Sequence, residues 1–343
     1  MKAYTNYNEG RRFFMKKIMN QPENIVNEML EGLVTIHDDL VYRVPNTNVI
    51  ARLAKTPNKV GLVSGGGSGH EPAHAGFVGD GMLSAAACGA VFTSPSPDQV
   101  LEAIKVADNG AGVLMIIKNY SGDIMNFDMA KELAELEDIK VDFIVVDDDI
   151  AVEDSTYTSG RRGVAGTVYV HKILGAAARS GLSLEEIKKI ADDLVPNIKT
   201  LGLAIKAATV PEVGKPGFDL GDDEIEFGIG IHGEPGYRRE KMKTSQEMAK
   251  ELVDTLSRSI SFEGNSFAIL VNGMGATPLM EQYVFANDVL PLIEAKGATV
   301  AYKKLGDYMT AIDMAGISLT VLNITDPRYL EWLDESVTTI AWN

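Results

Sequence analysis

The sequence has one cysteine, no long apolar run and fewer basic than acidic residues. Cys88 stands alone among 343 residues, which excludes an internal disulfide and a zinc site built from several cysteines. No apolar run approaches the length of a membrane span, so no membrane attachment is expected. Lysine and arginine total 32 against 48 aspartate and glutamate residues, a formal net charge of −16. This charge disfavours nucleic acid or an anionic membrane surface as a partner.

The first residues lack the apolar segment of a secretory signal. The stretch "MKAYTNYNEGRRFF" is charged, and Met15 offers a second start, so residues 1–14 are expected to be an extension or a tag. A cytoplasmic protein is the expectation. The apolar setting of Cys88, "LSAAACGAVF", predicts a buried structural thiol rather than a nucleophile.

Short apolar runs alternate with helical patterns in the first half of the chain. Strands are predicted at 59–64, 112–118 and 140–147, and helices at 23–36, 96–109, 128–137 and 167–195. Buried strands that alternate with helices predict an α/β domain with a mainly parallel sheet. The predicted bounds of this domain are 15–197.

The second half predicts another α/β domain, at 198–343, with a mixed sheet. Its strands are predicted at 224–232, 265–273, 297–306 and 316–324, with helices at 244–258 and 277–295. A chain of this length is expected to divide into two cores. The segment 311–343 is a candidate to pack back on the first domain.

Three glycine-containing loops follow predicted strands directly: "SGGGSGHEPAH", "KNYSGD" and "HGEPG". Ligands of open α/β sheets bind beyond the carboxyl ends of the strands, so these loops are the candidate site. The first loop is no nucleotide-binding motif, because His70 follows Gly69 where a Walker A loop needs lysine, and the dinucleotide pattern fails as well. Its glycines either let backbone N–H groups surround a ligand oxygen or form a tight turn.

The letters from His70 to His74 spell the H-E-x-x-H pattern of zinc hydrolases. Proline is tolerated only in the first turn of a helix, so Pro72 is predicted to start a helix and to leave His70 out of register with His74. No third ligand is evident. We therefore predict no metal site, and expect His74 to be a packed or capping histidine.

The other polar motifs leave two interpretations each. Lys118 and Asp123 are either a cation and a base for a substrate or parts of a solvated turn with a helix cap, and His232 is either reactive or a strand-end histidine. The acidic stretch 145–155 could hold Mg²⁺ or Ca²⁺ but suits a solvated edge better. Arg161 and Arg162 could bind an anion or offset this stretch. "VNGMGATP", residues 271–278, is a ligand-facing turn or a hinge.

The motifs in combination resemble one family. "LVSGGGSGHEPAHAG", "FTSPSPDQ", "IIKNYSGDIMNF", "VVDDDIAVEDS", "GRRGVAGT", "TVPEVGKPGF", "EFGIGIHGEPG" and "VNGMGATPL" occur in this order. The chain from about Met15 to Asn343 is similar to the K subunits of dihydroxyacetone kinases. The resemblance implies a cytoplasmic homodimer of two-domain chains that takes part in phosphorylating dihydroxyacetone to dihydroxyacetone phosphate.

The resemblance also implies roles for single residues. His232 would bond covalently to the carbonyl carbon of the substrate as a hemiaminal. His70 and Asp123 would hydrogen-bond the hydroxyls and serve in proton transfer, which makes these three the catalytic residues. The implied substrate-binding residues are Gly67, Ser68, Gly69, His70, Lys118, Asp123 and His232.

The sequence has no Walker A loop and no kinase-type glycine loop, so we expect no cofactor to be bound by this chain. Single-chain, ATP-using relatives are longer, and the chain is similar to the separate K subunit of the phosphotransferase-linked system. This implies a partner L subunit that carries ADP or ATP with Mg²⁺, and indirectly an M subunit with a phosphohistidine. The alternative is a non-catalytic paralogue that senses dihydroxyacetone and co-activates transcription.

Overall fold

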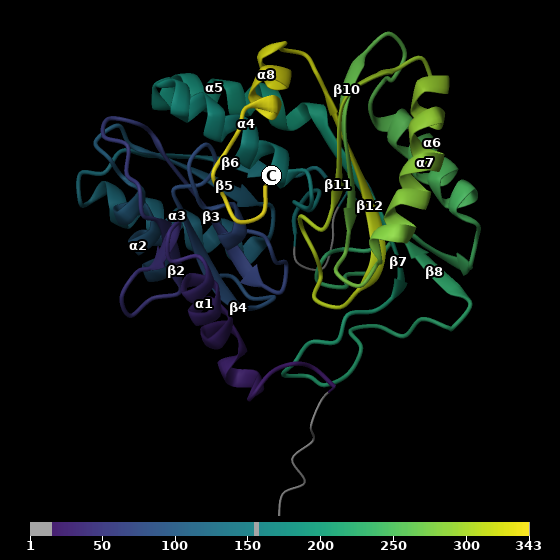
Figure 1. Cartoon of the computed structure of the whole chain (residues 1–343), viewed down its shortest axis with the longest axis horizontal. Coiled ribbons are helices and arrows are strands. Elements are labelled where there is room, and N and C mark those ends of the chain that lie inside the picture. The colour runs from purple at the N-terminus through teal and green to yellow at the C-terminus, as the bar shows by residue number, and fades with distance from the viewer. Residues whose placement is uncertain (1–15, 154–157, 343) are drawn as a thin grey trace, which may run out of the picture.

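The chain forms two six-stranded sheets with helices on their faces (Figure 1). This computed structural model describes residues 16–153 and 158–342, so the predicted extension at 1–14 lies outside the described residues. The prediction of an α/β fold with one mainly parallel and one mixed sheet is confirmed. Within the described ranges, no helix is both long and apolar enough to span a bilayer.

The first sheet has the strand order β1-β2-β4-β3-β5-β6. The four strands β4, β3, β5 and β6 run parallel, and β1 and β2 form an antiparallel edge. Strand β5 is buried at every position, as expected of a parallel strand covered on both faces. The strands are β1 (Val41–Arg43), β2 (Val49–Arg52), β3 (Gly61–Ser68), β4 (Ala85–Val91), β5 (Val113–Lys118) and β6 (Val141–Val146).

Helices cover both faces of the first sheet. Helices α2 and α3 pack together on one face, and α4 and α5 lie on the other. Helix α4 is buried from Thr167 to Ala178, because side chains of both sheets join the core around it. The helices of this half are α1 (Ile25–Ile36), α2 (Pro97–Ala107), α3 (Ser121–Glu135), α4 (Thr167–Ser180) and α5 (Leu184–Leu194).

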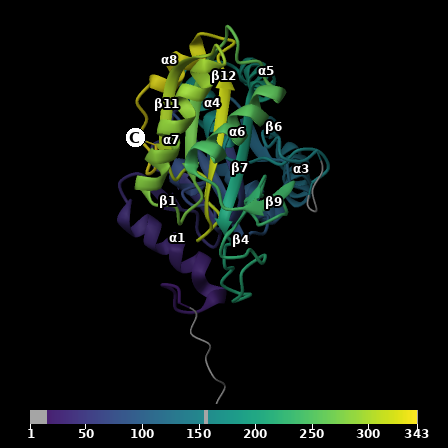
Figure 2. The ribbon, with the colours of Figure 1, turned by 90° about the vertical axis from the view of Figure 1, so that its right-hand side faces the viewer.

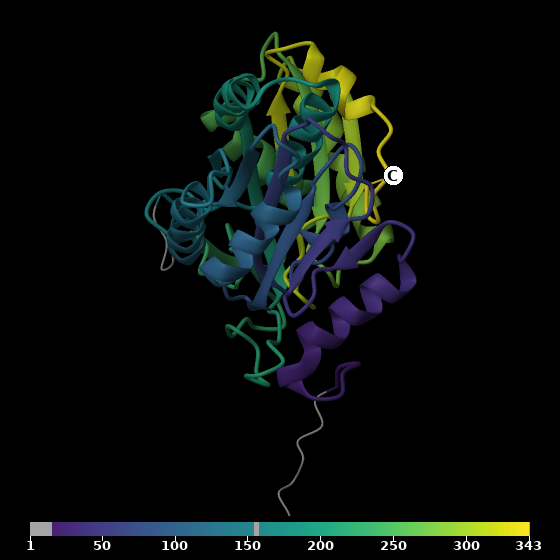
Figure 3. The same cartoon turned by 90° about the vertical axis from the view of Figure 1, so that its left-hand side faces the viewer.

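The second sheet has the order β11-β10-β12-β7-β8-β9, with only β10 and β11 parallel. Helices α6 and α7 cover its outer face (Figure 2), and Figure 3 views the molecule from the side of the first sheet. The elements are β7 (Ile198–Lys206), β8 (Glu224–Phe227), β9 (Arg238–Lys241), α6 (Ser245–Ser259), β10 (Ser266–Gly273), α7 (Leu279–Ala295), β11 (Thr299–Gly306) and β12 (Ala315–Asn323).

The chain ends against the central helix. Helix α8 (Arg328–Asp334) packs on α4, where Lys172 Nζ donates a hydrogen bond to the carbonyl of Trp332. Arg179 of α4 also pairs with Glu335. Within 311–343, β12 is therefore a central strand of the second sheet, whereas the part from α8 onward contacts a helix of the first half.

Two boundaries of the predicted elements follow local capping chemistry. The single helix predicted at 167–195 divides into α4 and α5, because Gly181 adopts φ 95° after α4. Ser183 then starts α5 with a capping box to Glu186. Thr244 and Glu247 form the same box at α6.

Other predicted boundaries are wrong. Strand β3 continues through the glycines to Ser68 instead of ending before them, since a glycine strand can lie directly against its neighbours. Pro72 starts no helix: residues 71–74 form turns, and one 3₁₀ turn follows at Ala75–Phe77. The strand predicted at 224–232 ends at Phe227, after which the chain turns at Gly228 with φ 79°.

The expected burial of Cys88 and His74 is confirmed. Burial, the dominant cause, raises the pKa of the Cys88 thiol to about 12, so this thiol is not a nucleophile at neutral pH. His74 is 4% exposed, and its Nδ1 lies 2.9 Å from Nε2 of His171 on α4. His74 is therefore a packed histidine.

Candidate active site

A buried lysine and a buried aspartate lie at the end of β5. Lys118 is the last residue of β5, and Asp123 lies in the first turn of α3. Lys118 Nζ lies 4.0 Å from Asp123 Oδ2, and Ser94 Oγ donates a short hydrogen bond to the other carboxylate oxygen. Lys118 Nζ has no hydrogen-bond partner among the described residues. A buried ammonium without a hydrogen-bond partner is energetically unfavourable, and a polar ligand that accepts a hydrogen bond from it would remove this cost.

Burial dominates the titration of this pair. It raises the pKa of Asp123, against the charge of Lys118 and the hydrogen bond from Ser94. It lowers the pKa of Lys118, against the charges of Asp123 and Glu234. A carboxylate with a raised pKa is better suited to take up a proton near neutral pH.

His70 follows β3 and has a defined tautomer. Its Nδ1 lies 2.7 Å from the carbonyl oxygen of Thr310, and because a carbonyl only accepts, Nδ1 carries the hydrogen. The ring is fully buried and stacks on Phe92, with the centroids 5.0 Å apart. Burial, and then the charges of His232 and Lys118, lower the pKa of His70 well below its usual value. This ring is therefore neutral, and its Nε2 is an acceptor.

His232 lies in the turn after β8 and meets His70. Its Nδ1 lies 2.9 Å from Oε1 of Glu234, and its backbone N–H donates to Oε2 of the same carboxylate at 3.0 Å. The ring of Tyr120 packs edge-on against it at 4.5 Å between centroids. Because the carboxylate only accepts, Nδ1 of His232 carries a hydrogen. Nε2 is therefore the nitrogen whose lone pair can react.

The Nε2 atoms of the two rings face each other. Nε2 of His70 and Nε2 of His232 are 3.0 Å apart. Both Nδ1 atoms already donate elsewhere, so a hydrogen bond between the Nε2 atoms requires one further proton on the pair. The carboxylate of Glu234, on the far side of the His232 ring, lies where its charge can balance such a proton. The site therefore brings two imidazole nitrogens to hydrogen-bond distance, where they can share a proton.

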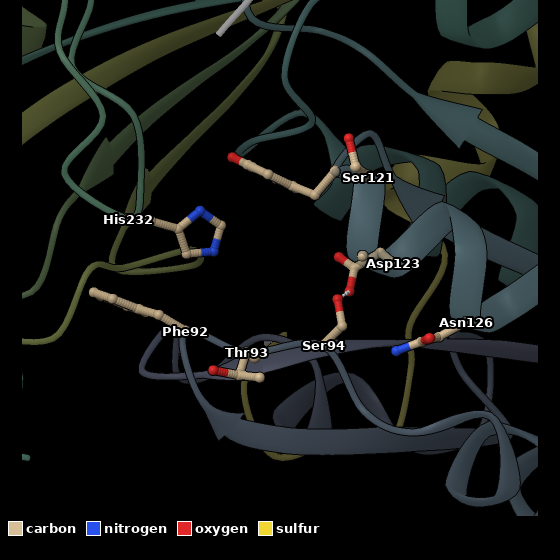
Figure 4. A pocket seen from close by; sticks show the side chains of 10 residues that line it. Phe92, Thr93, Ser94, Ser121, Asp123, Asn126 and His232 are labelled. Carbon is tan, nitrogen blue, oxygen red and sulfur yellow. Dashed lines mark hydrogen bonds between the residues drawn. The ribbon is translucent and has the colours of Figure 1, made fainter. Parts of the chain in front are cut away.

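A cavity of about 560 Å³ opens in front of these groups. Figure 4 shows His232 and Phe92 on one side of it and Asp123 with Ser94 on the other. The first residues of α3, from Ser121, form part of its wall. The arrangement brings an imidazole ring and a carboxylate to opposite sides of one small space.

The structure brings most of the predicted site residues together. His232, Asp123 and Gly67 line the cavity, His70 contacts His232, and Lys118 lies next to Asp123. Ser68 and Gly69 lie outside the lining. The Ser68 hydroxyl donates to the carbonyl of Gly89, and the Gly69 N–H donates to the Glu71 carboxylate. All of these substrate-binding roles stay predictions.

Sequence reasoning missed several groups that shape the site. Ser94, Phe92 and Tyr120 line the cavity, and Glu234 holds His232. Thr310, which fixes His70, lies 240 positions away in the sequence. Ser94 lies in the motif "FTSPSPDQ" and Glu234 in "EFGIGIHGEPG", so their place in these motifs could have marked them as site residues. Thr310 lies in none of the motifs, and only the fold shows its contact with His70.

The acidic stretch 145–155 is a solvated edge only in part: Asp147 and Glu153 are exposed, whereas Asp148 and Asp149 are buried. Asp148 is fully buried and accepts hydrogen bonds from the backbone of Val164 and Gly166 and from the Thr200 hydroxyl. Asp149 pairs with the buried Arg162 at 2.7 Å. These carboxylates bind the loop before α4. Residues 154–157 of the stretch lie outside the described residues.

The pattern from His70 to His74 forms no zinc site in this geometry. His70 faces His232, whereas His74 faces His171, so the two rings serve different contacts. No group of three or more histidine, cysteine, aspartate or glutamate side chains among residues 16–153 and 158–342 could hold a metal ion.

Comparisons with known proteins agree on one family. A profile of the Dak1 domain matches residues 31–341. The chain is 64% identical over 328 residues to the PTS-dependent dihydroxyacetone kinase, dihydroxyacetone-binding subunit DhaK, of Lactococcus lactis, which covers 95% of this chain and 99% of the relative. The solved structure of the dihydroxyacetone kinase operon co-activator Dha-DhaQ superposes with a TM-score of 0.88 at 43% identity, covering 92% and 97% of the two chains. The crystal structure of the dihydroxyacetone kinase of C. freundii gives 0.87 at 33% identity, over 96% of this chain but 60% of the other.

Proposed function

Because the chain belongs to the Dak1 family, we propose that it is the dihydroxyacetone-binding K subunit of a phosphotransferase-linked dihydroxyacetone kinase. In this role it binds dihydroxyacetone, receives a phosphoryl group from a nucleotide-bearing L subunit, and releases dihydroxyacetone phosphate. The L subunit holds ADP or ATP with Mg²⁺ and is recharged by an M subunit. The chain itself holds no nucleotide.

The observation that carries this proposal is the His70–His232 pair at the cavity. Nδ1 of His232 is committed to Glu234, so Nε2 is available to attack a carbonyl carbon. A polyol such as glycerol offers hydroxyls but no carbonyl, and cannot form this bond. Covalent capture therefore separates the ketone from its polyol analogue, which hydrogen bonds alone would do poorly.

The covalent step balances with the groups present. The proton shared by the two Nε2 atoms moves to His70, and the lone pair of His232 Nε2 then forms the bond to the carbonyl carbon. The π pair of the C=O bond moves to the oxygen, which takes the proton from His70 and becomes the hydroxyl of a hemiaminal. His70 ends neutral, and the ring of His232 ends as a substituted imidazolium.

Phosphoryl transfer then requires a base and a positive charge near the free terminal hydroxyl. Asp123, with its raised pKa, is the base that takes the hydroxyl proton. Lys118 supplies a cation beside it, 4.0 Å from the carboxylate. Because phosphoryl transfer depends mainly on positioning and charge stabilisation, an anchored substrate with these two groups suffices on the acceptor side.

The cavity supports a donor that comes from outside the chain. Its volume of about 560 Å³ exceeds what a three-carbon ketone fills, so the phosphoryl end of a donor can enter beside the substrate. The relative from C. freundii, which this chain covers over only 60%, is a longer dihydroxyacetone kinase.

The second candidate is a dihydroxyacetone sensor that co-activates transcription, because one structural relative at 43% identity is an operon co-activator. Sensing requires the His232 anchor but no base. The buried Lys118–Asp123 pair with its Ser94 hydrogen bond therefore favours the kinase subunit. The homodimer and the cytoplasmic location remain proposals that rest on the family alone.

A reconstituted assay tests the proposal. The purified chain is mixed with an L subunit loaded with ATP and Mg²⁺, and dihydroxyacetone phosphate is measured by a coupled oxidation of NADH. We expect product only when both proteins are present, and none with glycerol as acceptor. Binding of dihydroxyacetone without any transfer in this mixture would instead support the sensor.

A further inference from the structure

We infer that Glu234 is the positioning residue of His232, a role that deepens the proposed function and rests on it. Glu234 fixes the hydrogen of the ring on Nδ1, directs Nε2 toward the cavity, and opposes the positive charge that the ring carries in the hemiaminal. Glu234 does not line the cavity and touches no substrate in this proposal.

The contact geometry shows that both carboxylate oxygens of Glu234 are committed to His232. Oε1 accepts from the ring Nδ1 at 2.9 Å, and Oε2 accepts from the backbone N–H at 3.0 Å. Two hydrogen bonds to one residue fix both the backbone and the ring of His232. A carboxylate behind an imidazole is a general means of setting the tautomer of a reactive histidine.

The loop is built to hold this carboxylate next to His232. Its side chain is fully buried, and the backbone bonds Gly230 N to Glu234 O and Gly233 N to Gly230 O close the turn at 3.0 and 3.1 Å. A Cβ at Gly230 would stand 1.9 Å from Glu234 Oε2 and 2.7 Å from Arg162 Nη1. Only glycine leaves space here for the carboxylate and the neighbouring guanidinium.

Charges behind the loop keep Glu234 ionised despite its burial. Burial alone would raise the pKa of Glu234, but the hydrogen bond and charge of His232 and then the charge of Arg162 lower it to about 2. Arg162 is itself held by Asp149, which accepts from its Nε at 2.7 Å. Arg162 Nη1 has no hydrogen-bond partner among the described residues, so its charge remains directed to the surroundings of Glu234.

An anion in this place matters most after the covalent bond has formed. Before attack, the proton on the histidine pair can move between the two rings. In the hemiaminal, the positive charge is fixed on the substituted ring of His232, whose only hydrogen-bonding hydrogen is the one on Nδ1. The carboxylate of Glu234 accepts this hydrogen, so the adduct gains a charge-assisted hydrogen bond.

The first experiment measures the tautomer in the unmodified protein. With ¹⁵N-labelled histidine in the full chain, long-range ¹H–¹⁵N correlation spectra distinguish ring nitrogens with and without hydrogen, and His232→Asn assigns the signals. We expect Nδ1 of His232 to carry hydrogen. An Nδ1 without hydrogen would overturn the inference, whatever any variant does.

The second experiment measures the adduct in Glu234→Gln with dihydroxyacetone labelled with ¹³C at the carbonyl carbon. Capture converts this carbon from a ketone to a tetrahedral carbon, which ¹³C spectra resolve. Loss of one charged hydrogen bond predicts an adduct equilibrium constant about 10- to 100-fold lower in Glu234→Gln. An unchanged constant in a folded Glu234→Gln would overturn the inference.

Glu226→Gln is the matched control. Glu226 is also a buried glutamate near this loop, and it accepts from Gly236 N and from Arg239, but it has no contact with His232. We expect the adduct equilibrium constant of Glu226→Gln to equal that of the wild type. If the constant falls as far in Glu226→Gln as in Glu234→Gln, a general loosening of the loop explains both variants. That result would overturn the inference. If the wild type forms no adduct at all, the proposed function itself is wrong. This result is distinct from an adduct whose equilibrium constant is the same in the wild type and in Glu234→Gln.

Discussion

Replacing Asp123 by asparagine separates proton transfer from substrate capture. The substitution keeps the volume of the side chain and an oxygen that can accept from Ser94, but removes the negative charge 4.0 Å from Lys118 Nζ. A positioned general base contributes about 10²–10⁴-fold to a rate, so we expect phosphoryl transfer to slow by about that factor. Capture of dihydroxyacetone by His232 should persist, because Glu234 and His70, not Asp123, contact that ring.

The stability cost of Asp123→Asn follows from the same pair. Breaking a buried ion pair typically costs about 3–5 kcal/mol. Here burial raises the pKa of Asp123 and lowers the pKa of Lys118, so desolvation outweighs the attraction within the pair. We therefore expect a loss below about 3 kcal/mol in urea unfolding, which leaves a folded protein to assay.

The measurement is the reconstituted transfer rate with an L subunit, beside the ¹³C adduct signal of the same protein. Asp128→Asn, an exposed position on the same helix, is the control and should match the wild type. Unchanged transfer in Asp123→Asn would remove Asp123 from the role of base. Loss of the adduct together with transfer would show that Asp123 acts in binding instead.

Three further predictions concern the glycine strand, the buried aspartate and the buried histidines. Gly66→Ala places a Cβ 2.7 Å from Lys118 Nζ, at a residue with φ +150°. We therefore expect a higher KM for dihydroxyacetone and a stability loss of about 1–3 kcal/mol. Gly32→Ala, which points into open space on α1, is the control and should leave KM unchanged. Asp148→Ala leaves the buried N–H groups of Val164 and Gly166 unpaired, so urea unfolding should show a loss of about 2–6 kcal/mol, against at most about 0.5 kcal/mol for exposed Asp147→Ala. Burial lowers the pKa of His70, of His74 and, to about 3, of His171, so at these three histidines the unfolded chain binds more protons than the folded chain below pH 6.5. The contribution of His171 to stability should therefore be lost from pH 6.5 toward pH 3, so over this range the urea midpoint of the wild type should fall relative to that of His171→Gln; an equal slope in the two proteins would contradict this assignment.

The sequence predicts the layers of this fold better than it predicts the turns that make the site. The apolar run from Val113 to Lys118 identifies a buried parallel strand because its burial is continuous. Gly65 to Gly67 look like a loop by composition, yet they complete β3, since the neighbouring backbone lies so close that a Cβ at Gly65 would stand 2.4 Å from the carbonyl oxygen of Ala87. This contact joins two strands, so it cannot be predicted from the local sequence of either strand.

The site shows the same division. His70, Lys118, Asp123 and His232 could be named because each follows an apolar run and carries an ionisable group, although their residue-by-residue roles came from a family resemblance. Buried carboxylates could not be assigned in this way. Asp148 belongs to an acidic stretch whose composition predicts a solvated edge. The fold instead buries it and supplies three hydrogen-bond donors, which the spacing of residues in the sequence does not predict.

The histidine pair lies where the two halves of the chain meet. His70 follows a strand of the first sheet and His232 a strand of the second, and their Nε2 atoms come within 3.0 Å although 162 positions separate them. Each ring receives its tautomer from a different segment, His70 from the carbonyl of Thr310 and His232 from the carboxylate of Glu234. Thr310 lies between β11 and β12 of the second sheet, so a shift between the sheets would separate the two Nε2 atoms and would also break the contact that orients His70. The geometry of the histidine pair therefore depends on the packing of both sheets around α4, and the substrate capture that we propose depends on it as well.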